Sequence, residues 1–133
     1  MNRRSFLLAA TTPIFFPNPA HAYSFVAFTP EVWNELRQTD RTVILNFRAS
    51  WSFTSNQKLE IIAKLVGENP AYNNLTFVDI NWDHYGQSVL ASRMKVRRHS
   101  TLIATKSGVE ITRVVNEPLE HKMRAFLDAA LAA

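Results

Sequence analysis

The sequence predicts an α/β domain in which a central mixed β-sheet is flanked by helices on both faces. Segments with the apolar pattern of strands alternate along the chain with segments whose apolar residues have helical spacing. The segment 42–47 is apolar almost throughout, which is typical of a strand buried on both faces of a parallel sheet. Two later strand-like segments are separated only by a short turn at 106–108, which favours an antiparallel hairpin. The predicted order of elements is β-α-β-α-β-α-β-β-α.

The first four predicted elements lie between residues 25 and 67. A short strand at 25–28 is followed by a helix, with Thr29 as the N-cap and Pro30 at the first helical position. The strand at 42–47 leads into a second helix that begins near 52–55. Thr54 and Gln57 match a capping box at its start, and Gly67 is a plausible end.

The remaining elements complete the sheet and cover it. A strand is predicted at 75–80 and a short helix at 87–94. The hairpin strands follow at 101–105 and 110–115. The last helix runs from Pro118 to the end of the chain, where apolar residues at helical spacing form its inner face.

Residues 1–22 have the pattern of an export signal that precedes a domain at 23–133. Arg3-Arg4-Ser5-Phe6-Leu7 resembles the start of a twin-arginine signal, and an ordinary Sec signal with a chance arginine pair is the alternative. The apolar stretch that follows is too short to span a bilayer, and Ala20-His21-Ala22 fits a signal cleavage site. Both interpretations predict a periplasmic protein. An uncleaved membrane anchor is a minor alternative.

The composition excludes several classes of function. Two of the 15 lysines and arginines lie in the predicted signal, so the formal charge of +4 for the whole chain falls to +2 for the mature domain, which shows no nucleic-acid-binding stripe. The chain has no cysteine, so a disulfide or a lipid anchor on cysteine is excluded. His84, His99 and His121 are isolated and lack metal-ligand spacing, so no metal or cofactor is expected.

The segment 46–55, Asn-Phe-Arg-Ala-Ser-Trp-Ser-Phe-Thr-Ser, lies where the second strand passes into the second helix. It resembles the thioredoxin family, whose members carry Trp-Cys-x-x-Cys at this junction. Trp51 matches, and Ser52 and Ser55 occupy the two cysteine positions. The resemblance extends from about residue 25 to residue 133. It implies a thioredoxin-like fold and, for the family, thiol:disulfide oxidoreductase activity.

The resemblance also exposes two further departures from the family. Asn46 stands where the family buries an acid that relays protons, and Ser100 stands at the cis-proline position. We expect the His99–Ser100 peptide to be trans, because a cis bond before a residue other than proline costs about 2.5–4 kcal/mol. A serine hydroxyl cannot replace a thiolate in disulfide exchange. The chain as printed therefore has no catalytic residues for that reaction.

Two interpretations remain open at this point. The first is a natural protein with a degenerate motif that binds a protein or peptide partner. The second is the Cys-to-Ser form of a periplasmic thiol:disulfide oxidoreductase that acts on proteins. The first is slightly favoured, because the departures include Asn46 and Ser100 as well as the two motif serines.

The residues around the motif predict what such a partner would be. We expect Ser52 to lie close to Ser100, with Trp51 and Phe53 as an apolar wall. The expected basic rim consists of Arg48, Arg97, Arg98 and His99. Together with the N-terminus of the second helix, this rim would favour an acidic segment of a partner. The alternative is that these arginines are ordinary solvated surface.

Overall fold

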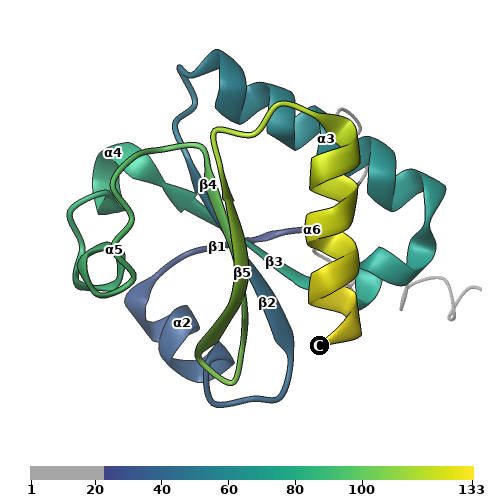
Figure 1. The fold of residues 1–133 in the computed structure, drawn as a ribbon. Helices are drawn as coiled ribbons and strands as arrows, with labels where there is room; N and C mark the ends of the chain where they lie inside the picture. The colour runs from purple at the N-terminus through teal and green to yellow at the C-terminus, as the bar shows by residue number, and fades with distance from the viewer. Residues whose placement is uncertain (1–22) are drawn as a thin grey trace, which may run out of the picture.

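The computed structural model describes residues 23–133, and the predicted signal at 1–22 lies outside the described residues. Within that range the chain forms a five-stranded mixed sheet in the order β1-β3-β2-β4-β5 (Figure 1). The strands are β1 (Val26–Ala27), β2 (Thr42–Arg48), β3 (Thr76–Asn81), β4 (Thr101–Lys106) and β5 (Val109–Val115). β3 pairs in parallel with β1 and β2, whereas β4 is antiparallel to both β2 and β5. The predicted mixed sheet is confirmed.

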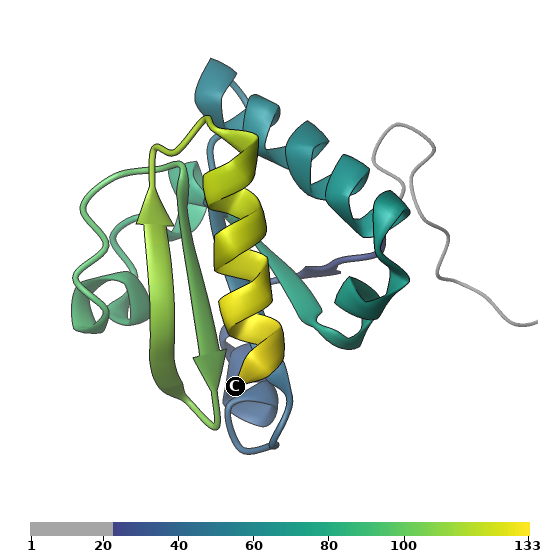
Figure 2. The same ribbon diagram turned by 45° about the vertical axis from the view of Figure 1, so that its right-hand side comes forward.

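Helices cover both faces of this sheet, as predicted. The helical elements are α2 (Pro30–Leu36), α3 (Phe53–Glu68), η1 (Pro70–Asn74), α4 (Trp82–Tyr85), α5 (Val89–Arg93) and α6 (Glu120–Ala132). Alternate residues of β2 point to opposite faces, so Ile44 packs in the core beneath α3 and α6, while Leu45 and Phe47 pack in the core beneath α2 and α5. Figure 2 shows α6 lying across one face of the sheet. None of the helices in residues 23–133 is long and apolar enough to cross a membrane.

The caps of the helices decide where the elements begin. Thr29 caps α2 as predicted, because its Oγ1 accepts a hydrogen bond of 3.1 Å from the backbone N–H of Val32. The prediction for α3 was wrong in its details. Ser52 is the N-cap and Thr54 lies inside the helix. Gly67 also lies inside α3, which ends at Glu68 because Pro70 follows and cannot donate a backbone hydrogen bond.

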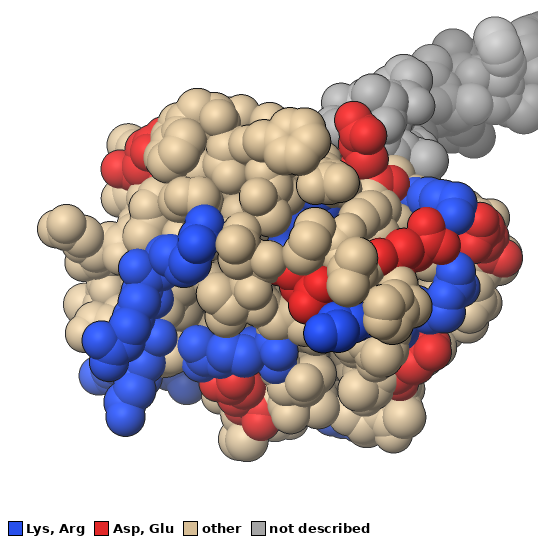
Figure 3. All heavy atoms as spheres, turned by 45° about the horizontal axis from the view of Figure 1, so that its top comes forward, with Lys and Arg blue, Asp and Glu red and all other residues tan. Residues whose placement is uncertain are grey.

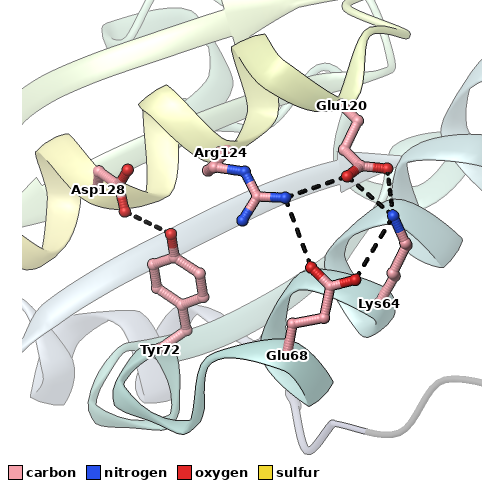
Figure 4. A network of polar contacts seen from close by, with 6 residues as sticks. All are labelled: Lys64, Glu68, Tyr72, Glu120, Arg124 and Asp128. Carbon is pink, nitrogen blue, oxygen red and sulfur yellow. Dashed lines mark hydrogen bonds and ion pairs between the residues drawn. The ribbon is translucent and has the colours of Figure 1, made fainter.

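A network of polar contacts holds α6 against α3 and η1 (Figure 4). The carboxylate of Glu120 accepts hydrogen bonds from Lys64, at 2.8 Å, and from Arg124, at 3.1 Å. The hydroxyl of Tyr72 in η1 donates to Asp128, which lies one turn after Arg124 in α6. Exposed ion pairs add little stability individually, so the main effect of the network is to fix how α6 lies on its neighbours.

Candidate functional site

The candidate site lies at the carboxyl end of β2, where the chain turns into α3. Ser52 caps this helix: its Oγ accepts a hydrogen bond of 3.2 Å from the backbone N–H of Ser55. Both serines are buried. The first N–H groups of a helix carry partial positive charge, so the end of α3 favours negative groups.

Three serine hydroxyls meet at this point. The Oγ of Ser100, which precedes β4, lies 2.7 Å from the Oγ of Ser55 and 3.4 Å from the Oγ of Ser52. The Nδ1 of His99 lies 3.1 Å from the same Ser100 Oγ. The expected proximity of Ser52 and Ser100 is confirmed. These polar groups satisfy one another inside the protein, as buried polar groups must.

Two backbone hydrogen bonds hold Ser100 in an unusual conformation. Its N–H donates to the carbonyl of Phe47 at 2.8 Å, and its own carbonyl accepts from the N–H of Asn116 at 2.8 Å. The His99–Ser100 peptide is trans, as expected, and Ser100 has φ of +62°, in the left-handed region that side chains other than glycine rarely adopt. The surrounding contacts therefore hold a strained residue at the centre of the site.

Lys58 lies beneath the serines and was missed by the sequence analysis. It is fully buried in α3, and its Nζ donates to the carbonyl oxygen of Ser100. The pKa of Lys58 is lowered to about 8, chiefly by burial; the negative charge of Glu117 opposes this effect, and the positive charge of Arg98 adds to it. A signal was present, because Lys58 falls on the apolar face of the helix with Leu59 and Ile62.

Two large aromatic side chains are exposed beside this buried cluster. Trp51 is 63% exposed and Phe53 is 79% exposed. The indole N–H of Trp51 donates to both carboxylate oxygens of Asp83, at 3.0 and 3.1 Å, and the indole packs edge to face with His99 at a centroid distance of 4.8 Å. Burial is the main cause that lowers the pKa of His99, and the positive charge of Arg98 also lowers it. Trp51 is therefore held in place while its ring faces solvent.

The arginines of the expected rim lie in different environments. Arg48 forms two hydrogen bonds with Asp79, at 2.9 and 2.8 Å, so its charge is already paired. Arg97 and Arg98 are exposed, and the Nε of Arg98 donates to the backbone carbonyl of His99 at 3.1 Å. Figure 3 views the end of the molecule where α3 begins. Blue side chains gather on the side of the view where α4 and α5 lie in Figure 1.

The remaining predicted position, Asn46, is buried in β2 and pairs in register with Asp79 of β3 and Leu102 of β4. An amide there cannot act as a general base. Among residues 23–133, no three histidine, aspartate or glutamate side chains gather closely enough to hold a metal ion. The site thus combines a closed set of hydroxyls, one buried ammonium group and an exposed aromatic pair.

A comparison with solved structures finds thioredoxins. The fold is similar to that of a thioredoxin from Malassezia sympodialis, with a TM-score of 0.69 and 20% identity over 86% of this chain and 97% of that one. Trxlp from Edwardsiella tarda gives a TM-score of 0.67 and 21% identity over 77% and 97% of the two chains. Thioredoxin from Trypanosoma brucei brucei gives 0.63 and 20% over 85% and 99%.

Comparisons at the level of sequence add nothing to this result. No protein-family model matches the chain, and no curated protein sequence does. At 20–21% identity, the structural likeness establishes the fold and leaves the activity open. The chain has the thioredoxin fold and, because it has no cysteine, it lacks the dithiol of a thioredoxin.

Proposed function

We propose that this protein binds an acidic segment of a partner protein or peptide without any redox step. The binding surface consists of Trp51, Phe53, His99, Arg97 and Arg98, and is called the aromatic surface below. The single observation that carries the proposal is the exposure of Trp51 and Phe53, on either side of the buried Ser52, at 63% and 79%. Exposed aromatic side chains are enriched at protein interfaces and dominate their binding energy.

The contacts of Trp51 support binding of a partner over ordinary surface exposure. Because Asp83 and His99 fix the indole, little rotational freedom is lost when a partner covers it. The hydroxyls of Ser52, Ser55 and Ser100 are occupied with one another, so the floor of the site offers no free nucleophile. The proposal therefore assigns affinity to the exposed rings and not to the buried serines.

Near the rings, two exposed arginines stand against one carboxylate, that of Asp83, and this excess of positive charge favours an acidic partner. Arg97 and Arg98 are exposed on the loop before Ser100, and the buried ammonium group of Lys58 adds positive potential from below. Arg48 contributes no free charge, because Asp79 neutralises it. We further propose, from the pattern of residues 1–22, that binding takes place in the periplasm after export.

The alternative is the Cys-to-Ser form of a periplasmic protein-disulfide oxidoreductase. One observation favours it. The hydroxyls of Ser52 and Ser55 both contact the hydroxyl of Ser100, so the two side chains point to the same place, as two cysteines that form a disulfide must. Asn46 weighs against it, because it leaves the position of the family's proton relay without an acid.

Peptide selection with the purified protein tests the proposal. A library of random peptides should yield binders that combine Asp or Glu with an apolar residue. Trp51→Ala/Phe53→Ala and Arg97→Glu/Arg98→Glu should each lose these peptides. Arg37→Glu/Arg93→Glu changes the net charge by the same amount and should retain them, because those two arginines lie elsewhere, along a cavity lined by residues of α2 and α5. Binders without acidic residues, or equal losses in both arginine variants, would contradict the proposal.

A further inference from the structure

A cavity of about 720 Å³ lies away from the serines, between α2, α5 and the β4–β5 hairpin. Its apolar lining includes Phe28, Trp33, Leu90 and Met94. Phe28 is buried, and its ring packs edge to face against Tyr85 at a centroid distance of 4.8 Å. The volume falls in the range of about 300–1,000 Å³ that is usual for sites of small molecules.

Hydrogen bonds tie the three walls of this cavity together. The Ser107 hydroxyl, at the tip of the hairpin, donates to the carbonyl of Thr39 after α2 at 3.2 Å. A guanidinium N–H of Arg113 in β5 donates to the carbonyl of Met94 after α5 at 2.6 Å. Gly108 has φ of +80°, and a Cβ added there would lie 3.6 Å from the Cβ of Arg37. The cavity is therefore largely preformed.

The charges along the cavity are unbalanced. Glu110 is its one acidic lining residue, and both of its carboxylate oxygens accept hydrogen bonds of 2.7 Å from Arg113, which lowers the pKa of Glu110. Arg37 donates to the neutral side chain of Asn34 at 2.9 Å. Neither Arg37 nor Arg93 takes part in an ion pair with any acidic group of residues 23–133. Two positive charges thus lie unopposed beside an apolar lining.

We propose that this cavity binds a small amphiphilic carboxylate. The apolar body of the ligand lies against Trp33, Leu90 and Met94, and its carboxylate accepts hydrogen bonds from Arg37 and Arg93. A guanidinium group is suited to this contact, because its planar donors match the two oxygens of a carboxylate. A purely apolar cavity would bind an acid and an alcohol of the same length about equally. Because Arg37 and Arg93 lie along this cavity, we expect it to prefer the acid. The inference is independent of the aromatic surface.

Decanoate, kept below the concentration at which it forms micelles, is the probe. Titration of the ¹⁵N-labelled protein should shift the amide resonance of Gly108, which lies along the cavity, and leave that of Gly67 in α3 unchanged. Decanol should bind at least tenfold more weakly than decanoate, because it offers the arginines no charge. Equal affinity for decanol and decanoate, or shifts at Gly67 as large as those at Gly108, would overturn the proposal.

A pair of matched variants tests the two arginines directly. Arg37→Gln/Arg93→Gln should weaken decanoate binding about tenfold, with the loss of two charge-assisted contacts. Arg41→Gln/Lys122→Gln removes the same charge at exposed positions outside the cavity and outside the aromatic surface, and should leave the affinity unchanged within twofold. Equal effects of the two variants would mean that only net charge matters, and the cavity would then carry no specific site. The decanol comparison uses the unaltered protein, so it decides the question even if a variant folds poorly.

Discussion

The Nζ of Lys58 donates a hydrogen bond to the backbone carbonyl of Ser100, and both residues are fully buried. This contact joins the second turn of α3 to the residue that precedes β4, directly below the serine hydroxyls. It places a group that is ordinarily charged inside the protein. Burying a charged ammonium group costs free energy, so Lys58 releases its proton more easily in the folded protein than in the unfolded chain. The stability of the protein should therefore depend on pH in the range where Lys58 titrates.

We predict that the free energy of unfolding rises with pH between about 8 and 9.5, by up to about 1.4 kcal/mol per pH unit. Burial lowers the pKa of Lys58 from 10.5 to about 8 in the folded state. Between these values the unfolded chain keeps the proton that the folded chain has released, so raising the pH favours folding. Urea unfolding at several pH values measures the slope.

Two variants isolate the contribution of Lys58 to that slope. Lys58→Met should flatten the curve over this range, because it removes the titrating group. Lys95→Met changes an exposed lysine and should leave the slope as it is in the unaltered protein. A slope that survives in Lys58→Met would mean that another group causes it.

The conformation of Ser100 predicts an unusual order of stability between two variants. Ser100→Gly and Ser100→Ala both lose the hydroxyl that contacts Ser55 and His99, so both should be less stable than the unaltered protein. Because φ is +62°, glycine should be more stable than alanine here by about 1 kcal/mol. Denaturation in urea compares them. An alanine variant as stable as the glycine variant would show that the left-handed conformation is not enforced.

Much of the fold could be predicted from the sequence because the strands carry strong local signals. The apolar segment 42–47 became β2, and the segments on either side of Ser107 and Gly108 became the hairpin of β4 and β5. Apolar runs and a two-residue turn specify strands without help from distant residues. The short elements η1 and α4 were not predicted, since a single turn has no periodicity and depends on caps such as the Asn81 side chain, which accepts from the N–H of Asp83 at 2.9 Å.

The candidate site was predicted less completely because it depends on contacts between distant segments. The motif and its resemblance located Ser52, Ser55 and Ser100. The pairing of Arg48 with Asp79 could not be foreseen, because it depends on the parallel register of β2 and β3. The choice of Ser52 over Thr54 as the cap was also undetermined, since either hydroxyl suits a helix start.

Restoring the two cysteines tests whether only the sulfur is missing. The unaltered protein should reduce insulin no faster than the dithiothreitol background, since it has no thiol. We predict that Ser52→Cys/Ser55→Cys is a slow reductase, because the buried Asn46 cannot accept a proton. Adding Asn46→Asp should then raise the rate by about tenfold or more. A double variant as fast as a thioredoxin would favour the alternative, in which the serines replaced cysteines in an active enzyme.

The predicted twin-arginine signal has its own test. Arg3→Lys/Arg4→Lys should block export while the domain at 23–133 folds inside the cell, because that pathway requires the arginine pair. Cell fractionation measures where the protein accumulates. Continued export of the variant through the Sec machinery would remove the twin-arginine assignment and leave the periplasmic one.

The central claim, that the aromatic surface binds a partner without thiol chemistry, is tested most directly by photo-crosslinking in the cell. A benzophenone amino acid is placed at Phe53, which is 79% exposed, and, as a control, at Val109, which is 68% exposed. We predict discrete cross-linked products from position 53 alone. These products should withstand reducing agents and disappear when Arg97→Glu/Arg98→Glu is added. Products of equal abundance from both positions, or none from position 53, would contradict the claim.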